Sequence, residues 1–149
     1  MELAQFLVKA KLAGYASQEA VNEKMLDDGS RELTVDGEEF HYRDRYLGFN
    51  PFVGEEVVFH GGKVVWAMNY YGEILNDAAP AKQIYGFLQQ AMRQVGEDRP
   101  FRGPSRFLQG DLEYHDESQG DIDQFTGVEV IFYQGREVYR LVYHGGRVG

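Results

Sequence analysis

The sequence contains no cysteine among its 149 residues. This absence excludes a disulfide framework, a thiolate metal site and a cysteine nucleophile, and it fits a protein of the reducing cytosol. Net positive charge is also lacking, because 24 acidic residues outnumber 15 basic ones and leave a formal net charge of −9. Such a surface repels phosphate groups, so the composition argues against direct binding of nucleic acids and of anionic membranes.

Long apolar runs are missing as well. No segment approaches the roughly 20 consecutive apolar residues that a membrane-spanning helix needs. Near the N-terminus, Glu2, Lys9 and Lys11 interrupt the apolar pattern, so this segment does not resemble a signal peptide. We therefore expect a soluble, cytoplasmic protein, and the length fits a single domain with its own core.

Motifs that carry well-known chemistries are absent too. The sequence has no His-Glu-x-x-His metal motif, no Walker loop and no Gly-x-Ser-x-Gly elbow. Its four histidines are scattered, and His115 beside Asp116 does not by itself define a metal site. The sequence therefore predicts no cofactor and no metal, identifies no catalytic residue, and favours a binding or interaction protein over an enzyme.

Aromatic residues, in contrast, are abundant, with ten tyrosines, ten phenylalanines and one tryptophan. Buried rings contribute large apolar areas, and tyrosine adds a hydroxyl group that suits the wall of a pocket. A well-packed, β-rich core accounts for most of these rings, and a ligand pocket is the alternative use.

The most informative positive feature is an internal repeat. Segment 52–72 recurs as segment 125–145 at a constant offset of 73 residues, and nine of the 21 aligned positions are identical. A repeat of this kind indicates a supersecondary unit that packs against its own copy. The sequence therefore predicts a duplicated fold with a pseudo-twofold axis.

Hydrophobic patterns predict the same elements in both halves, a helix followed by about four antiparallel strands. Apolar residues at helical spacing predict a first helix over roughly 2–13, which Gly14 would end. In the second half, Asp77 would cap a helix with Pro80 in its first turn. The predicted strands are 32–35, 39–46, 53–60 and 63–71, then about 105–109, 111–116, 126–133 and 136–144.

These elements predict an α+β fold in which the helices pack on antiparallel sheet. One domain would span residues 1–149 and consist of two repeats, about 1–75 and 76–149. Whether the repeats form one continuous sheet or two stays open. Between the first helix and the first strand, a short helix is possible before the clear turn signal of residues 27–30.

Two-residue loops at 61–62 and 134–135 predict how the last two strands of each half pair. Counting back from the first loop places Val57 opposite Trp66 on the core face. The same count in the second half places Val130 opposite Tyr139, and the agreement between the two halves supports this register.

The other face of these strands carries the first group of candidate site residues. Glu56 would face an alanine, which leaves its carboxylate free, and Asn69 and Tyr71 would share its face. In the second half the equivalent Glu129 would pair with Arg140 on a wet surface. The alternative is that both are solvated sheet faces, which antiparallel sheets commonly have.

Two further carboxylates fall on the predicted core side. Glu55 would lie opposite Met68, and Asp44 follows Tyr42 in a Tyr-x-Asp pattern that recurs at residues 114–116. A buried carboxylate must find hydrogen bonds or a cation, or stay protonated. We favour a structural role for Asp44 over that of a catalytic acid.

Four segments of the sequence resemble a known family. They are Gly48-Phe-Asn-Pro-Phe-Val-Gly-Glu-Glu-Val-Val, Val65-Trp-Ala-Met-Asn-Tyr-Tyr-Gly72, Glu97-Asp-Arg-Pro-Phe-Arg-Gly-Pro104 and Val138-Tyr-Arg-Leu-Val-Tyr-His-Gly-Gly146. Over nearly its whole length the sequence is similar to the bacterial domain-of-unknown-function 5680 family. Members occur alone or fused behind an Xre-type helix-turn-helix, which implies a role compatible with effector sensing beside a transcriptional regulator. This sequence begins directly at the domain, so DNA binding is not implied, and the family has no established catalytic residues.

Three functions fit these observations, and we favour a small-molecule or peptide-binding module whose pocket lies where the halves meet. The candidate ligand-binding residues are Asp44, Glu56, Trp66, Asn69, Tyr70, Tyr71 and His144. The first alternative is a homodimeric protein-interaction domain that buries a sheet face or pairs an edge strand. The second is an enzyme that uses Glu56 or Asp44 as acid or base with His60 or His144.

Overall fold

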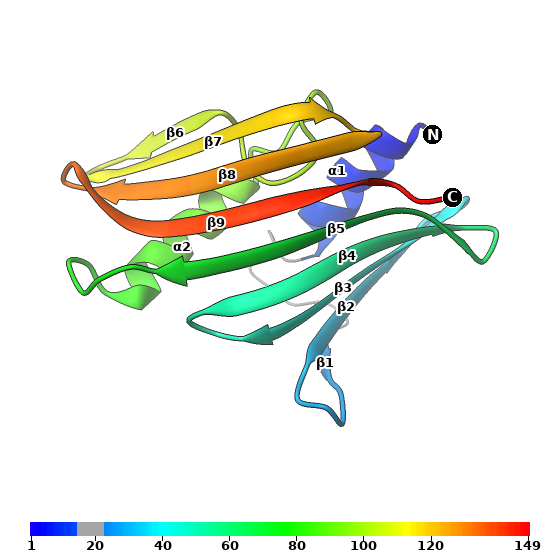
Figure 1. Cartoon of the computed structure of the whole chain (residues 1–149), viewed down its shortest axis with the longest axis horizontal. Coiled ribbons are helices and arrows are strands. Elements are labelled where there is room, and N and C mark those ends of the chain that lie inside the picture. Colours follow the sequence, from blue (N-terminus) through cyan, green and yellow to red (C-terminus); the bar gives the residue numbers. More distant parts are fainter. Residues whose placement is uncertain (15–22) are drawn as a thin grey trace.

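The computed structural model describes residues 1–14 and 23–149. Within these residues the chain is α+β, with two helices and nine strands that join one antiparallel sheet (Figure 1). The helices are α1 (Leu3–Ala13) and α2 (Ala81–Met92). The strands are β1 (Lys24–Met25), β2 (Arg31–Asp36), β3 (Phe40–Gly48), β4 (Phe52–His60), β5 (Lys63–Ile74), β6 (Arg106–Gln109), β7 (Leu112–Asp121), β8 (Gln124–Tyr133) and β9 (Arg136–Arg147).

The sheet is continuous, which answers the question that the sequence leaves open. Its strand order is β1-β2-β3-β4-β5-β9-β8-β7-β6, so two antiparallel meanders meet where β5 pairs with β9. Both helices lie against the same face of this sheet (Figure 1). Helix α1 contacts β2 and β3, whereas α2 contacts β7. One face is thereby covered and the other is left open.

The two helices form where the apolar periodicity predicts them. Helix α1 buries Leu3, Phe6, Leu7 and Ala10, and Gly14 follows its last turn. In α2 the N-cap is Pro80, so the predicted capping role of Asp77 is wrong. Proline needs no hydrogen bond for its own nitrogen, which suits the start of a helix. Neither helix in the described part of the chain is long and apolar enough to cross a membrane.

The predicted strands are all present, with some differences at their ends. Strand β1 has no counterpart in the sequence prediction, and β7 and β9 continue several residues beyond their predicted ends. The turn at residues 27–30 is confirmed by the hydrogen bond from the Leu26 nitrogen to the Ser30 oxygen. The short helix considered before that turn falls largely on residues 15–22, which lie outside the described residues.

The predicted register holds only beside the loops. His60 pairs with Lys63 as expected, but the register then shifts by one residue between Val58 and Phe59. An equivalent shift interrupts the pairing of β8 with β9. These bulges insert one extra residue in β5 and in β9, so Trp66 pairs with Val58 instead of Val57.

A one-residue slip sends every later side chain of a strand to the opposite face. Glu56 and Glu129 therefore lie on the covered face, with exposed fractions of 0%. The prediction that Glu56 occupies a wet face opposite alanine is wrong, and so is the predicted pair of Glu129 with Arg140, which binds Glu137 instead. Glu55, predicted to be in the core, is exposed and pairs in register with Asn69.

The core lies between the covered face of the sheet and the two helices, and it is rich in stacked rings. Trp66 stacks on Phe125 with ring centroids 5.7 Å apart, and Phe125 stacks on Phe101 at 3.9 Å. The indole nitrogen of Trp66 donates a hydrogen bond to the carbonyl oxygen of Ile122. These contacts join β5 to β8 and to the segment after α2, so the aromatic core spans both meanders.

Candidate ligand-binding cavity

Four buried carboxylates lie on the covered face of the sheet. Asp44 and Glu56 occupy directly opposite positions on β3 and β4, and Asp116 and Glu129 do so on β7 and β8. All four are at most 4% exposed. A carboxylate buried to this degree needs hydrogen bonds or a cation nearby, because desolvation strongly disfavours an isolated charge.

The first cluster consists of Lys11, Tyr42, Asp44, Glu56 and Tyr70. The Lys11 ammonium group lies 2.8 Å from Oε1 of Glu56, and the Tyr42 hydroxyl donates to the same oxygen at 2.7 Å. The Tyr70 hydroxyl donates to Oδ1 of Asp44 at 2.6 Å. In the sequence Lys11 interrupts the apolar pattern of the first helix, yet its side chain is fully buried. The apolar pattern of this helix does not indicate that Lys11 forms an ion pair with Glu56.

The second cluster consists of Arg99, Arg102, Tyr114, Asp116, Glu129, Tyr139 and Tyr143. Arg102 binds Glu129 with both Nε and Nη2, at 3.1 Å and 2.9 Å. The Tyr143 hydroxyl donates to Oδ1 of Asp116 at 2.7 Å, and Nη2 of Arg99 lies 3.2 Å from the same oxygen. Every carboxylate of this cluster therefore has an arginine as counter-ion.

Two glycines allow these tyrosines to reach across the sheet. Tyr70 of β5 pairs in register with Gly54 of β4, and a Cβ atom built on Gly54 would lie 2.2 Å from the Tyr70 hydroxyl oxygen. Gly127 has the same relation to Tyr143. The absence of a side chain lets each ring lie over the neighbouring strand, so that its hydroxyl meets the aspartate one strand further on.

The two clusters differ in how their aspartates are balanced. Asp116 forms an ion pair with Arg99. Among the described residues, Asp44 forms no ion pair and accepts only the hydrogen bond from Tyr70. Burial raises the pKa of Asp44 to about 7, and the charge of Glu56 adds to the increase. Burial and the charge of Glu129 likewise raise the pKa of Asp116 to about 7. Asp44 is thus a buried carboxyl group with unused hydrogen-bonding capacity.

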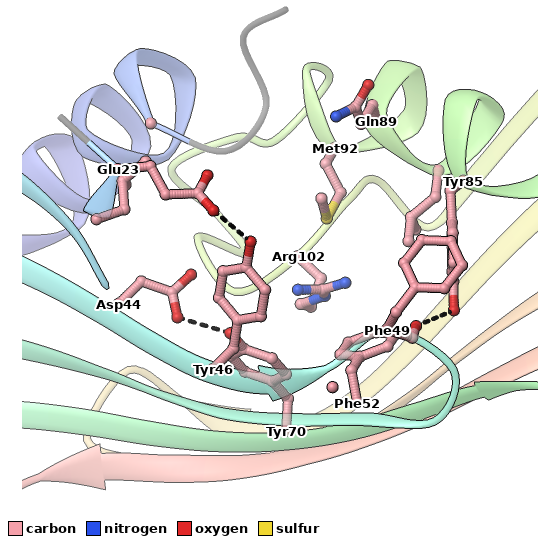
Figure 2. A pocket seen from close by; sticks show the side chains of 14 residues that line it. Glu23, Asp44, Tyr46, Phe49, Phe52, Tyr70, Tyr85, Gln89, Met92 and Arg102 are labelled. Carbon is pink, nitrogen blue, oxygen red and sulfur yellow. Dashed lines mark hydrogen bonds between the residues drawn. The ribbon is translucent and has the colours of Figure 1, made fainter. Parts of the chain in front are cut away.

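A cavity of about 270 Å³ opens beside Asp44. Its floor is the covered face of the sheet, and side chains of α2 lie across from it (Figure 2). Five aromatic rings line the cavity, namely those of Tyr46, Phe49, Phe52, Tyr70 and Tyr85. Its polar lining comes from Glu23, Asp44, Gln89 and Arg102. Apolar walls with few polar groups are typical of sites for small molecules.

Hydrogen bonds hold the walls of this cavity in place. The Tyr85 hydroxyl of α2 donates to the carbonyl oxygen of Phe49 at 2.7 Å, and their rings meet edge to face. Partial burial raises the pKa of Tyr85 to about 12, which keeps this donor protonated. On the other side, the Tyr46 hydroxyl donates to Glu23 at 2.7 Å (Figure 2). The cavity is therefore preformed in the described structure.

The seven candidate residues from the sequence divide among three places. Asp44 and Tyr70 line the cavity together. Glu56 belongs to the first cluster, and Trp66 lies in the aromatic core. The other three, Asn69, Tyr71 and His144, are exposed on the open face of the sheet.

The open face carries a row of exposed apolar side chains around one of these residues. Leu47, Val53, Tyr71 and Val142 occupy paired positions on four neighbouring strands. Each is more than 40% exposed. Tyr71, predicted to share a face with Glu56, therefore lies on the surface opposite the cavity.

Several residues that line the cavity are not among the candidates predicted from the sequence. Phe49 and Phe52 belong to the Gly-Phe-Asn-Pro-Phe segment that carries the family resemblance, and Arg102 belongs to another such segment. Their presence in these motifs is the feature of the sequence that distinguishes them from other aromatic and basic residues. Tyr46 and Tyr85 carry no comparable signal, because an aromatic residue in an apolar pattern is expected to fill the core.

The histidines lie away from the cavity. None of the described residues that line the cavity is a histidine. His41 lies against Asp36 and His115 against Glu113, both at the surface. No group of three or more potential metal ligands was found among the residues that the structure describes.

Comparison with known proteins identifies one family. The family described as "Domain of unknown function (DUF5680)" matches residues 44–148. No curated protein and no solved structure matches the chain. The matched part begins at Asp44 and includes most of the cavity, whereas α1 with Lys11 precedes it. Because the match extends over more than half of the chain, this protein belongs to the DUF5680 family.

Proposed function

We propose that this protein is a small-molecule-binding module, of the kind that senses an effector, and that the cavity beside Asp44 is its binding site. One observation carries this proposal. Asp44 is only 4% exposed, accepts one side-chain hydrogen bond from the described residues, and lines a preformed cavity whose walls are largely aromatic. A buried carboxylate that folding leaves partly unsatisfied is costly, and a bound ligand would supply the missing partner.

The position of the cavity supports the expectation that the site lies where the two halves of the chain meet. Asp44 and Tyr70 come from the first meander, whereas Tyr85 and Arg102 come from α2 and the segment after it. Its volume of about 270 Å³ lies near the lower limit of known ligand pockets, which favours a small molecule over a peptide. The lack of a histidine in the described lining gives the enzyme alternative no acid-base partner for Asp44.

We also infer that the fold arose by internal duplication. The sequence repeat supports this, and so does the recurrence of the same residue types at matching places in the two clusters. Tyr42 and Asp44 correspond to Tyr114 and Asp116, each 72 residues later. Glu56 corresponds to Glu129, 73 residues later. On this proposal the two clusters are copies that have diverged: Asp44 lines the aromatic cavity, whereas Asp116 lines a separate hollow together with Arg99 and Tyr143.

A thermal-shift screen with a metabolite library tests the proposed site. Phe49→Ala removes a ring from the cavity wall, and Phe49 is 66% exposed, so the substitution should leave the fold stable. Compounds that raise the melting temperature of the wild type should lose most of this effect with Phe49→Ala. Isothermal titration calorimetry on the best compounds should give a dissociation constant at least about fivefold weaker for the variant, equivalent to about 1 kcal/mol.

Tyr71→Ala is the matched control, because it removes an exposed ring from the open face of the sheet. It should leave the shifts unchanged. The proposed site is wrong if no compound stabilises the wild type, or if Tyr71→Ala abolishes binding while Phe49→Ala preserves it.

A further inference from the structure

We propose that the cavity recognises a small organic amine, whose protonated nitrogen binds the carboxylate of Asp44 while its apolar part packs among the aromatic rings. This assignment rests on the proposed function, since it names the ligand class of the same site. Three features of the structure support it: the contrast between the two clusters, the charges around the cavity, and the aromatic walls of the cavity.

The second cluster indicates what Asp44 lacks. Asp116 accepts a hydrogen bond from Tyr143 and an ion pair from Arg99 at 3.2 Å. Asp44 accepts the equivalent hydrogen bond from Tyr70, but among the described residues no arginine or lysine forms an ion pair with it. A protonated amine in the cavity would occupy the role that Arg99 has in the other cluster, and it would offer the N–H donors that a carboxylate accepts.

The charges around the cavity favour a cation over an anion. Two carboxylates, Glu23 and Asp44, line it, and Arg102 is the only basic side chain among the described lining residues. Arg102 is already bound to Glu129 through two hydrogen bonds. Glu23 in turn lies 3.8 Å from Nη1 of Arg31. Of the charged side chains in the described lining, Asp44 is therefore the one without an ion pair, and its charge favours a cationic ligand.

The walls suit the rest of such a ligand. Phe49 and Phe52 both contact the ring of Tyr85, with their centroids 5.0 Å and 6.1 Å from the Tyr85 centroid. Aromatic rings attract cations through their faces and pack against apolar groups, so they complement both parts of an arylalkyl or alkyl amine. The volume of about 270 Å³ restricts the ligand to a small one.

Three matched probes test the assignment on the full-length protein by NMR titration or calorimetry near pH 7.5. They are 2-phenylethylamine, its neutral analogue 2-phenylethanol, and the anion 3-phenylpropanoate. The amine should bind at least about tenfold more tightly than either analogue. Asp44→Asn keeps the shape of the side chain and an acceptor for Tyr70, and it should weaken binding of the amine at least about tenfold. Asp116→Asn makes the same change in the second cluster and should leave the affinity within about twofold.

The outcomes separate the ligand class from the function itself. Binding of the alcohol or the carboxylate at least as tight as that of the amine, with loss of affinity in Phe49→Ala, would mean that the cavity binds ligands but not amines as a class. Unchanged affinity of the amine in a folded Asp44→Asn variant would also overturn the assignment. If none of the three probes binds, the amine assignment fails, and the metabolite screen alone decides the proposed function. The comparison of probes needs only the wild type, so it holds even if a variant fails to fold.

Discussion

At the scale of single residues, the buried aspartates are held in an environment that disfavours their ionised form. Burial raises the pKa of Asp44 and of Asp116 to about 7, and the neighbouring Glu56 and Glu129 carboxylates add to the increase. The hydrogen bonds that these aspartates accept from tyrosine hydroxyl groups lower their pKa values, but only in part. Each aspartate therefore changes its charge near neutral pH, where an ordinary aspartate is already ionised.

The raised pKa values predict that the protein loses stability as the pH rises. An aspartate in the unfolded chain has a pKa of about 3.9, so between pH 4 and pH 7 the folded state binds the proton more tightly. The stabilisation is complete below pH 4 and disappears as the pH passes 7. Urea denaturation should therefore give a free energy of unfolding that is lower at pH 7.5 than at pH 5.5, by on the order of a few kcal/mol.

The double variant Asp44→Asn/Asp116→Asn is the control, because neither amide titrates. Its free energy of unfolding should depend much less on pH over the same interval. A wild type with equal stability at the two pH values would contradict the raised pKa values. So would a double variant with the pH dependence of the wild type.

At the scale of elements, one lysine connects α1 to the rest of the fold. Lys11 forms the ion pair with Glu56 of β4 and also donates to the carbonyl oxygen of Phe101 in the segment after α2. Burial lowers the pKa of Lys11 against the opposing influence of Glu56. The helix therefore depends on a polar contact as well as on its apolar stripe.

Lys11→Met should destabilise the protein strongly, because it leaves Glu56 buried without its cation. Loss of one partner of a buried ion pair typically costs about 3–5 kcal/mol. The double variant Lys11→Met/Glu56→Gln should recover a large part of this loss, and urea denaturation of the four proteins gives the coupling energy. Lys9→Met, a change at an exposed position of the same helix, should alter stability by less than about 0.5 kcal/mol. If the effects of Lys11→Met and Glu56→Gln on the free energy of unfolding are additive, Lys11 and Glu56 do not interact.

Substitution of alanine for Gly54 and for Gly86 should change the stability of the protein in opposite directions. In Gly54→Ala the new Cβ atom would lie 2.2 Å from the Tyr70 hydroxyl oxygen, so the ring must move away from Asp44. We expect a loss of about 1–3 kcal/mol, as for overpacking in a core. In Gly86→Ala, within α2, the added Cβ atom would have nothing within 4 Å apart from its chain neighbours and the backbone of the helix. Here we expect a gain of about 0.5–1 kcal/mol from helix propensity. Thermal and urea denaturation measure both, and a neutral Gly54→Ala would argue against the close approach of Tyr70.

At the scale of the whole molecule, the two meanders share one sheet and one core. Nine residue pairs join β5 to β9, from Trp66 with Arg147 to Ile74 with Tyr139. The stacking of Trp66 on Phe125 crosses the same seam. The open face, with its exposed apolar row around Tyr71, is not covered by any described element. The homodimer considered from the sequence stays a prediction.

This shared core predicts that the two halves unfold together. Trp66 is the only tryptophan, so intrinsic fluorescence reports on the seam, whereas far-UV circular dichroism reports on the whole sheet. For a single cooperative unit, the two signals should give the same urea midpoint and the same slope. Separate transitions would mean that the meanders unfold independently.

Much of the fold and part of the site can be predicted from the sequence. Local periodicity and turn residues place both helices and nearly all strands, and the Tyr-x-Asp pattern correctly assigns Asp44 to the interior. The assignment of Glu56 fails, because the bulge depends on how β4 and β5 coil together within the sheet. Lys11 is missed because a lysine in an amphipathic helix is normally a surface residue.

The sequence by itself determined the α+β class, the two helices and the antiparallel strands, because these follow from contacts between residues close in the chain. Only the tertiary structure decided that both meanders form one sheet, that Lys11 meets Glu56, and that Asp44 opens into an aromatic cavity. These features bring together segments that are far apart in the sequence, from α1 to the region after α2. Their formation depends on the register and curvature of the assembled sheet, which no local pattern specifies.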